Sequence, residues 1–325
     1  MLEKLLNVEN LTIYYWTLRG YVHAVEDISF SLDKGDTLGL AGESGCGKTT
    51  AMLGILRLLP HNAIVRGKIF FEGKNLLEIP IETFRKEIRW KKIATVFQGA
   101  MNSLHPTIKI GDQIAEAIML HEKVSKKEAW ERAQRLLDLV GVKAERADRY
   151  PHELSGGLKQ RTMIAMSLAC NPTLVIADEP TTALDVIVEA QVLKVMKELQ
   201  EKLQLTMIFV THDLSLIAET CNKVAIMYAG KIVEMGDVVT VYKEPMHPYT
   251  QKLLAAFPSI LGRKTELVSI PGFPPDLLYP PSGCRFHPRC EYAMEICKKE
   301  EPQIISAGKR LVACHLYTKG GSMNA

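Results

Sequence analysis

Residues 42–50 read Gly-Glu-Ser-Gly-Cys-Gly-Lys-Thr-Thr, and this stretch decides the fold of the chain. The short apolar run 36–41 precedes it and predicts a buried strand, and residues 52–56 after it have the apolar spacing of a helix. A strand, a glycine-rich loop and a helix form the context in which Gly-x4-Gly-Lys-Thr binds nucleotide phosphates. We call residues 42–50 the phosphate loop.

The residue types of the phosphate loop suit a nucleotide bound with magnesium. Glycines let the backbone bend, so that successive N–H groups and the N-terminus of the next helix point at phosphate oxygens. Lys48 would reach the β- and γ-phosphates, and the Thr49 hydroxyl would ligate Mg²⁺. We therefore expect the nucleotide to be bound by Gly42, Ser44, Gly45, Cys46, Gly47, Lys48, Thr49 and Thr50.

A second phosphate-site motif follows much later in the chain. The apolar run 173–177 predicts another buried strand, and it leads into Asp178-Glu179. At the carboxyl edge of a strand, Asp178 would hold Mg²⁺ through a water, and Glu179 would polarise the attacking water as a general base. Between the two motifs, residues 154–158 read Leu-Ser-Gly-Gly-Leu, and Ser155 is a suitable N-cap for a helix that begins there.

A phosphate loop, a Leu-Ser-Gly-Gly signature and an Asp-Glu pair in this order resemble the ATP-binding subunits of ABC (ATP-binding cassette) proteins. The resemblance implies an α/β fold, namely a P-loop NTPase of the ABC type. Its parts are a RecA-like core, an N-terminal antiparallel β subdomain and a helical subdomain that carries the signature. It also implies ATP and Mg²⁺ as cofactors and ATP hydrolysis as the reaction. Two chains would sandwich two ATP molecules head to tail, so an isolated subunit should hydrolyse ATP poorly.

The same resemblance assigns roles to further residues. Gln98, after the strand-like run 93–97, would contact Mg²⁺ and the attacking water, and His212, after 207–211, would sense the γ-phosphate. With Glu179 they form the expected catalytic set. Asp185 would belong to a loop that bridges the two ATP sites of a dimer. The signature residues expected to contact the ATP of the partner chain are Ser155, Gly156, Gly157 and Gln160.

Two further expectations concern single side chains near the nucleotide. An N-terminal aromatic ring should stack on adenine; Tyr15 aligns best, and Tyr14 and Tyr21 are alternatives. Cys46 precedes a helix N-terminus, which is expected to lower the pKa of its thiol. Alkylation of that thiol would then block ATPase activity.

Length and composition limit what the rest of the chain can be. Its 325 residues leave room for a nucleotide-binding domain, 1–258, and a C-terminal extension, 259–325. A net charge of +3 is too small to indicate nucleic acid as a partner. The sequence has no run of 18 apolar residues and does not begin with a signal peptide. We therefore expect an intracellular chain that is peripheral to the cytoplasmic face of the membrane and acts there through partners.

Hydrophobic periodicity divides the first domain into three kinds of structure. Short alternating pieces up to about residue 32 predict a small antiparallel sheet, and 69–74 predicts a hairpin. Helical patterns dominate from about 99 to 170, most clearly in 126–140. Strands and helices alternate again over 174–233. The middle stretch is the expected helical subdomain.

The stretch 244–251, Glu-Pro-Met-His-Pro-Tyr-Thr-Gln, resembles the branch of the family that energises oligopeptide and dipeptide uptake, with relatives for nickel and oligosaccharides. The resemblance covers nearly the whole chain. It implies a second ATPase subunit, related or identical, two transmembrane permease subunits, and an extracytoplasmic binding protein that selects the substrate. Gly99 and His105 stand where peptide importers usually have Asp and Asn, at the region that docks on the membrane partner, so the partner's identity stays open.

Two other functions are weighed against transport. A soluble ABC ATPase of DNA repair would carry a far longer insertion between Lys48 and Ser155, and relatives that act in translation usually carry two cassettes per chain. A regulator that binds ATP without turnover is disfavoured because Glu179 and His212 are both present.

Four of the seven cysteines crowd the C-terminal extension: Cys284, Cys290, Cys297 and Cys314. A reducing cytosol disfavours disulfides, the C-x2-C pairs of common zinc sites are absent, and unliganded thiols remain a further alternative. The run 283–290, Gly-Cys-Arg-Phe-His-Pro-Arg-Cys, is similar to D-type subunits of peptide importers, some of which bind a 4Fe-4S cluster. The resemblance thus implies a 4Fe-4S cluster on the four thiolates, with zinc as the alternative. A metal would also stabilise a proline-rich segment that is too small for a core of its own.

Overall fold

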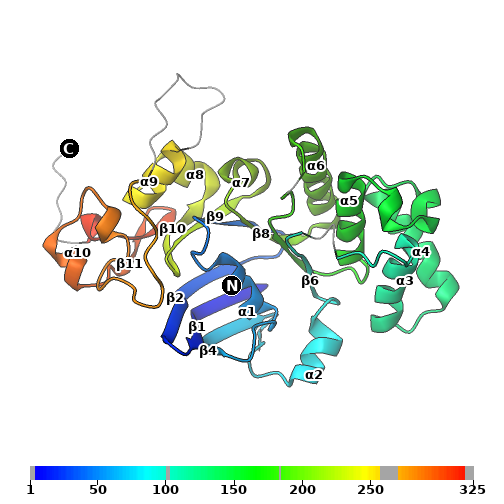
Figure 1. Ribbon diagram of the computed structural model, residues 1–325, viewed down its shortest axis with the longest axis horizontal. Coiled ribbons are helices and arrows are strands. Elements are labelled where there is room, and N and C mark those ends of the chain that lie inside the picture. Colours follow the sequence, from blue (N-terminus) through cyan, green and yellow to red (C-terminus); the bar gives the residue numbers. More distant parts are fainter. Residues whose placement is uncertain (1–3, 100–102, 183, 257–269, 319–325) are drawn as a thin grey trace. The chain divides into compact units, whose positions relative to one another are not determined.

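The computed structural model describes residues 4–99, 103–182, 184–256 and 270–318, and they form two compact units (Figure 1). Within the described residues, the first unit consists of 33–37 and 78–209. The second unit is made of the remaining segments, which flank the first in sequence. The domain boundary expected at residues 258 and 259 lies outside the described residues.

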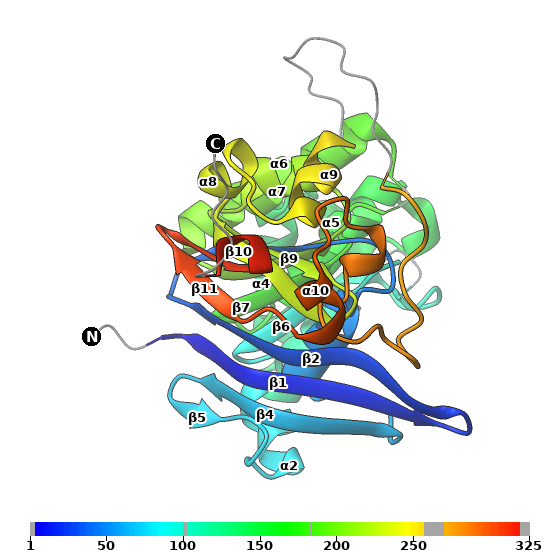
Figure 2. The same cartoon turned by 90° about the vertical axis from the view of Figure 1, so that its left-hand side faces the viewer.

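An antiparallel sheet forms the N-terminal part of the second unit, as the alternating sequence predicts (Figure 2). Val8 and Leu11 are both buried although they are an odd number of residues apart. The reason is a β-bulge between them, where Asn10 has a φ of 51°, so the same strand face stays on the core. In the order β2-β1-β4-β5, the strands are Gly20–Leu32, Leu6–Thr17, Ala63–Phe71 and Lys74–Asn75.

The second unit also contains most of the strand that leads into the phosphate loop, β3 (Thr37–Ala41). It pairs in parallel with β9 (Lys223–Tyr228), and the sheet continues antiparallel through β10 (Lys231–Asp237). The last two strands come from the C-terminal extension: β12 (Arg310–Ala313) pairs with β10, and β11 (Ile304–Ala307) pairs with β12. The sequence of the extension shows no clear strand pattern and therefore does not predict this pairing.

An aromatic cluster joins the extension to the core of the second unit. Tyr228, Tyr249 and Phe286 are all buried, and their ring centroids lie 4.6 to 5.4 Å apart. The C-terminal extension, which is too small to form a core of its own, therefore packs into the core of the second unit. The helices of this unit are α1 (Lys48–Ile55), α7 (Leu214–Thr220), α8 (Val238–Lys243), α9 (Pro248–Ala255) and α10 (Glu295–Lys299), with 3-10 turns at His287–Arg289 and His315–Tyr317.

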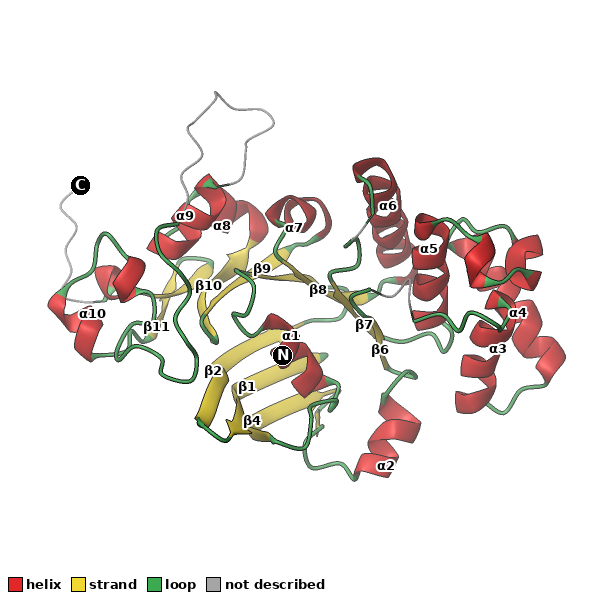
Figure 3. Ribbon diagram, viewed as in Figure 1, coloured by secondary structure: helices red, strands yellow, loops and turns green. Residues whose placement is uncertain are grey.

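The first unit combines a short sheet with the predicted helices (Figure 3). Its strands follow the order β8-β7-β6, with bounds Thr206–Thr211, Leu174–Asp178 and Ile93–Val96. The apolar stripe expected over 126–140 is buried in α4. The helical segments are α2 (Ile81–Thr83), a π-helical turn (Phe84–Ile88), α3 (Ile110–His121), α4 (Lys126–Leu139), 3-10 turns at Ala144–Asp148 and Pro151–Glu153, α5 (Gly156–Ser167) and α6 (Val186–Leu203).

Helix α9 begins at a buried histidine. The Nδ1 atom of His247 accepts a hydrogen bond from the backbone N–H of Tyr249 at 3.0 Å, and so caps the helix. The backbone N–H groups of Met246 and His247 donate to the buried carboxylate of Glu234, each at 2.9 Å. Burial lowers the pKa of His247 to about 3, so the ring is neutral and Nδ1 stays an acceptor.

This histidine should make stability depend on pH. The pKa of His247 in the folded state lies below that of an exposed histidine. Between about pH 6.5 and about pH 3, the unfolded chain therefore binds a proton that the native chain does not bind. His247→Asn keeps a capping oxygen but cannot titrate. As pH falls through that window, the free energy of unfolding of the native chain should decrease by about 1.4 kcal/mol per pH unit more than that of H247N. Urea unfolding across the window measures this, and parallel curves would show that His247 titrates normally.

Candidate nucleotide site

Two glycines of the phosphate loop sit where no side chain fits. Gly42 has a φ of 151°, and a Cβ there would lie 2.1 Å from the carbonyl oxygen of Met227. Gly47 has a φ of 103°, and a Cβ there would lie 2.2 Å from the carbonyl oxygen of Ala24. The bend that exposes the N–H groups of the loop therefore requires glycine at both positions.

Lys48 is the first residue of α1 and is buried against the loop that precedes it. Its Nζ atom donates to the carbonyl oxygens of Gly42 at 2.7 Å and Glu43 at 3.0 Å. The ammonium group thus lies inside the curve of the phosphate loop, next to the N-terminus of α1, while Ser44 and Thr49 are exposed. This combination of a cation and a helix N-terminus is what an anionic phosphate group requires.

The N-terminal tyrosines differ in what they contact. The hydroxyl of Tyr15 donates to Thr50 Oγ1 at 3.3 Å, which places this half-buried side chain beside the phosphate loop. Tyr14 instead packs on His23, with ring centroids 4.2 Å apart, and hydrogen bonds to Glu26. Tyr21 is 47% exposed. Among the described side-chain contacts of the three candidates for adenine stacking, the hydrogen bond to the phosphate loop comes from Tyr15.

The prediction of a low pKa for Cys46 is wrong. The side chain is only 4% exposed, and burial raises the pKa of the thiol despite the opposing charge of Lys48, whose Nζ lies 3.7 Å from Sγ. Desolvation of the thiolate outweighs the nearby cation. The thiol is therefore a poor nucleophile, and the expected inhibition by alkylation loses its chemical basis.

The first unit brings Gln98 and Glu179 together. Glu179 directly follows β7 and has a φ of 45°, a strained value for a residue with a side chain. The amide Nε2 of Gln98 donates to Glu179 Oε2 at 2.5 Å, and the hydroxyl of Thr182 donates to the same oxygen at 3.0 Å. Asp178 is buried at the end of the strand, whereas Gln98 is exposed. The carboxylate is thus held by two polar groups at the end of β7.

The remaining predicted residues lie in or next to α5 and α6, or directly follow a strand. Ser155 is the N-cap residue of α5, as predicted, while Gln160 is buried in that helix. Asp185 caps α6, where its Oδ1 atom accepts from the N–H of Val188 at 3.0 Å. His212 follows β8 directly and is exposed in the second unit. The roles expected for these residues toward a partner's ATP and the γ-phosphate stay predictions.

Contacts from C-terminal segments to the phosphate loop were not foreseen. The guanidinium group of Arg289 forms a two-pronged ion pair with Glu43, at 2.6 and 3.0 Å. The hydroxyl of Tyr249, from the His-Pro-Tyr-Thr stretch, accepts from the N–H of Glu43 at 2.9 Å. The sequence singled out both stretches as family patterns, but it carries no signal for the residue that each would contact.

The four cysteines of the extension line one small cavity together. Burial raises the pKa of the Cys314 thiol to about 12 and that of Cys284 to about 11, and the neighbouring thiols add to both shifts. Within the described residues, however, no group of three or more His, Cys, Asp or Glu side chains has the arrangement of a metal site. The structure therefore does not support the predicted metal-binding extension.

Comparisons with known proteins agree with this fold. The family model "ABC transporter" matches residues 25–182, and "Oligopeptide/dipeptide transporter, C-terminal region" matches 233–297. Among solved structures, an ATP-binding cassette in a dimeric post-hydrolysis state bound to ADP and Pi aligns with a TM-score of 0.64 at 26% identity. That alignment covers 72% of this chain and 98% of the other. The fold is thus an ABC-type P-loop NTPase with mixed sheets and helices.

Curated relatives show to which branch of the ABC transporter family the chain belongs. The oligopeptide transport ATP-binding protein of Bacillus subtilis is 48% identical over 92% of this chain and 85% of its own length. That of Escherichia coli is 44% identical over 96% and 93%, and the dipeptide transport ATP-binding protein of B. subtilis is 43% identical over 97% and 95%. The chain belongs to the family of ATP-binding subunits of oligopeptide and dipeptide ABC importers, and it is an ATPase coupled to transport.

The burial of Cys46 leads to a direct chemical test. In the native chain we expect iodoacetamide to label Cys46 more slowly than in the unfolded chain, and the rate to keep rising above about pH 9 because the thiolate is the reacting form. Mass spectrometry of digested samples measures each site separately. Labelling in urea provides the control for intrinsic reactivity. Equal rates for Cys46 in the native and unfolded chain would contradict its burial.

Proposed function

We propose that this subunit hydrolyses ATP with Glu179 as the general base and Gln98 as the residue that orients the attacking water and contacts Mg²⁺. The observation that carries the proposal is the position of the Glu179 carboxylate, which accepts hydrogen bonds from Gln98 and Thr182. A base held in one orientation at the end of a buried strand suits proton removal from a water. Asp178, next to it, would hold Mg²⁺ through a water.

The phosphate loop would bind the triphosphate. Its N–H groups would donate hydrogen bonds to the phosphate oxygens, Lys48 would contact the β- and γ-phosphates, and Thr49 would ligate Mg²⁺. Tyr15 is the proposed adenine-stacking residue, and its contact with Thr50 supports this choice over Tyr14. His212 would sense the γ-phosphate. Mg²⁺ supplies charge stabilisation when bound, while the protein positions the water and the nucleotide.

The partners follow from the family. We infer that two ATPase subunits, related or identical, pair so that Ser155, Gly156, Gly157 and Gln160 of one chain face the ATP of the other, with Asp185 between the sites. The dimeric cassette bound to ADP and Pi supports this arrangement by similarity. Two transmembrane permease subunits and an extracytoplasmic binding protein would complete the importer, and nickel or an oligosaccharide is the alternative cargo.

The subunit would act at the cytoplasmic face of the membrane. No helix in the part of the chain that the structure describes is long and apolar enough to cross a bilayer. Membrane attachment would therefore come from the permease partners.

Replacement of the proposed base tests the catalytic assignment. Glu179→Gln should lower ATP turnover by about 10²–10⁴-fold, while the affinity for ATP changes by less than about threefold, because the general base acts on water and not on binding. Turnover is measured in the assembled transporter, and affinity with a fluorescent ATP analogue. Glu198→Gln, on the surface of α6 and paired with Lys202, is the matched control and should change neither quantity. Full turnover in E179Q would refute the assignment.

We propose separately that the four cysteines of the extension ligate a 4Fe-4S cluster. The resemblance of residues 283–290 to D-type subunits supports this proposal; the four thiols line one cavity, although they do not have the arrangement of a metal site there. Metal and sulfide analysis of anaerobically purified protein should find about four iron and four sulfide per chain, with broad absorption near about 400 nm. One zinc without sulfide would replace this proposal with a zinc site, and neither metal would refute both.

A further inference from the structure

We propose that Arg289 positions the phosphate loop and neutralises Glu43, so that the affinity for ATP depends on the C-terminal extension, here residues 270–318. The inference rests on the proposed role of the phosphate loop as the ATP site. It adds a residue from far outside the nucleotide motifs to the set that determines binding. Arg289 would act through Glu43, as a positioning residue, without contacting the nucleotide.

The Arg289 side chain is built into its place. It is 5% exposed, and both terminal nitrogens bind Glu43: Nη1 donates to Oε2 at 2.6 Å and Nη2 donates to Oε1 at 3.0 Å. Its Nε atom donates to the carbonyl oxygen of Pro271 at 2.8 Å, and Nη1 also lies 3.3 Å from the hydroxyl of Tyr228. A planar guanidinium group held by so many partners allows one position for the carboxylate that it binds.

Glu43 in turn is tied to the loop by its backbone. Its N–H donates to the Tyr249 hydroxyl at 2.9 Å, and its carbonyl oxygen accepts from Lys48 Nζ at 3.0 Å and from the N–H of Cys46 at 3.3 Å. The side chain and both backbone groups of this single residue therefore connect the extension, α9 and the curve of the loop. A shift of the Arg289 side chain would be passed directly to the groups proposed to bind phosphate.

Charge gives the contact a second effect. Glu43 places a carboxylate in the loop proposed to receive a triphosphate, and like charges at short range repel strongly where water is partly excluded. The Glu43 side chain is 24% exposed, so solvent screens it only in part. The bidentate ion pair with Arg289 cancels this charge. Without the guanidinium group, the loop would present a negative charge to an anionic ligand.

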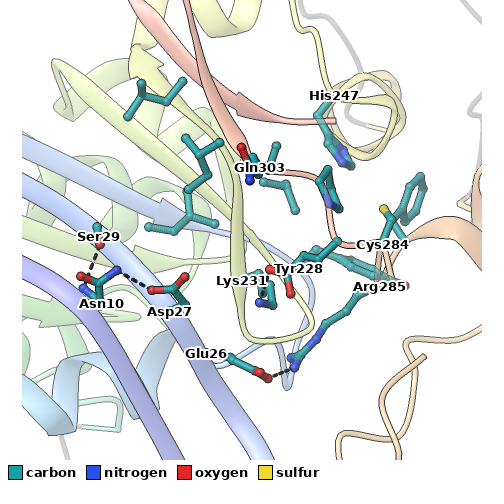
Figure 4. Close-up of a pocket in the computed structure, with 18 residues that line it drawn as sticks. Asn10, Glu26, Asp27, Ser29, Tyr228, Lys231, His247, Cys284, Arg285 and Gln303 are labelled. Carbon is teal, nitrogen blue, oxygen red and sulfur yellow. Dashed lines mark hydrogen bonds and ion pairs between the residues drawn. The ribbon is translucent and has the colours of Figure 1, made fainter. Parts of the chain in front are cut away.

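A second arginine of the extension makes a parallel contact, on the wall of a cavity of about 700 Å³ (Figure 4). Arg285 pairs with Glu26 of β2 and donates to the carbonyl oxygen of Ala229. Glu26 also hydrogen bonds to Tyr14, the neighbour of Tyr15. Arg285 directly follows Cys284, and Arg289 directly precedes Cys290. The short cysteine-bearing segment therefore determines where both guanidinium groups lie.

The test compares ATP affinity in full-length variants. Arg289→Met should weaken binding of a fluorescent ATP analogue about tenfold, a typical size for coupling between two sites, with kcat at saturating ATP nearly unchanged. Adding Glu43→Gln to R289M should restore most of the affinity, because the uncompensated charge is removed. The matched control is Glu301→Gln, which breaks the ion pair with Lys231 that also anchors the extension but does not touch the phosphate loop. It should leave the affinity unchanged.

Melting temperatures of all variants are recorded alongside. Native affinity in R289M would overturn the proposal. An equal loss of affinity in R289M and E301Q would also overturn it, because that result would show a general effect on folding. If R289M does not fold, Glu43→Gln alone decides, because it should bind ATP at least as tightly as the native chain; weaker binding would overturn the proposal. A separate variant tests whether the phosphate loop is the ATP site at all. If it is not, Lys48→Ala should bind ATP as tightly as the native chain does.

Discussion

The curve of the phosphate loop exists because three backbone segments approach one another too closely for side chains. The carbonyl oxygens of Met227 and Ala24 occupy the space where Gly42 and Gly47 would carry a Cβ. The N–H of Gly230 donates to the carbonyl oxygen of Cys46 at 2.9 Å, which joins the loop to the turn between β9 and β10. This close backbone packing fixes the loop, places Lys48 inside it and buries Cys46.

The same packing brings acidic side chains near a site meant for an anion. Glu43 lies in the loop itself and Glu26 lies on β2, and each is paired with an arginine of the extension. Buried ion pairs add little net stability, because desolvation offsets the attraction. Their value here lies in specifying one arrangement and in cancelling negative charge. The extension thereby becomes part of the nucleotide-binding unit, joined to it by a sheet, an aromatic cluster and these two pairs.

Features that depend on interactions between residues close in sequence could be predicted from the sequence, and features that depend on distant contacts could not. The strands before Gly42 and Glu179, the helix over 126–140 and the N-terminal antiparallel sheet all follow from local periodicity, and the structure confirms them. The pKa of Cys46 was misjudged because the helix N-terminus is visible in the sequence and the burial of the thiol is not. The strands β11 and β12 were missed because their pairing with β10 depends on partners distant in the chain.

The sequence by itself determined the class of this protein. Its phosphate loop, signature and Asp-Glu pair are contiguous motifs whose chemistry depends on residue type and order, and they identified an ABC ATPase, while the stretch 244–251 indicated the peptide-importer branch. Only the tertiary structure decided which side chains surround those motifs. Arg289 and Glu43 are 246 positions apart, and no local pattern pairs them. The same holds for Tyr249 against the loop and for the cavity that the four cysteines share: burial and charge compensation are properties of the folded chain, set by contacts between distant segments.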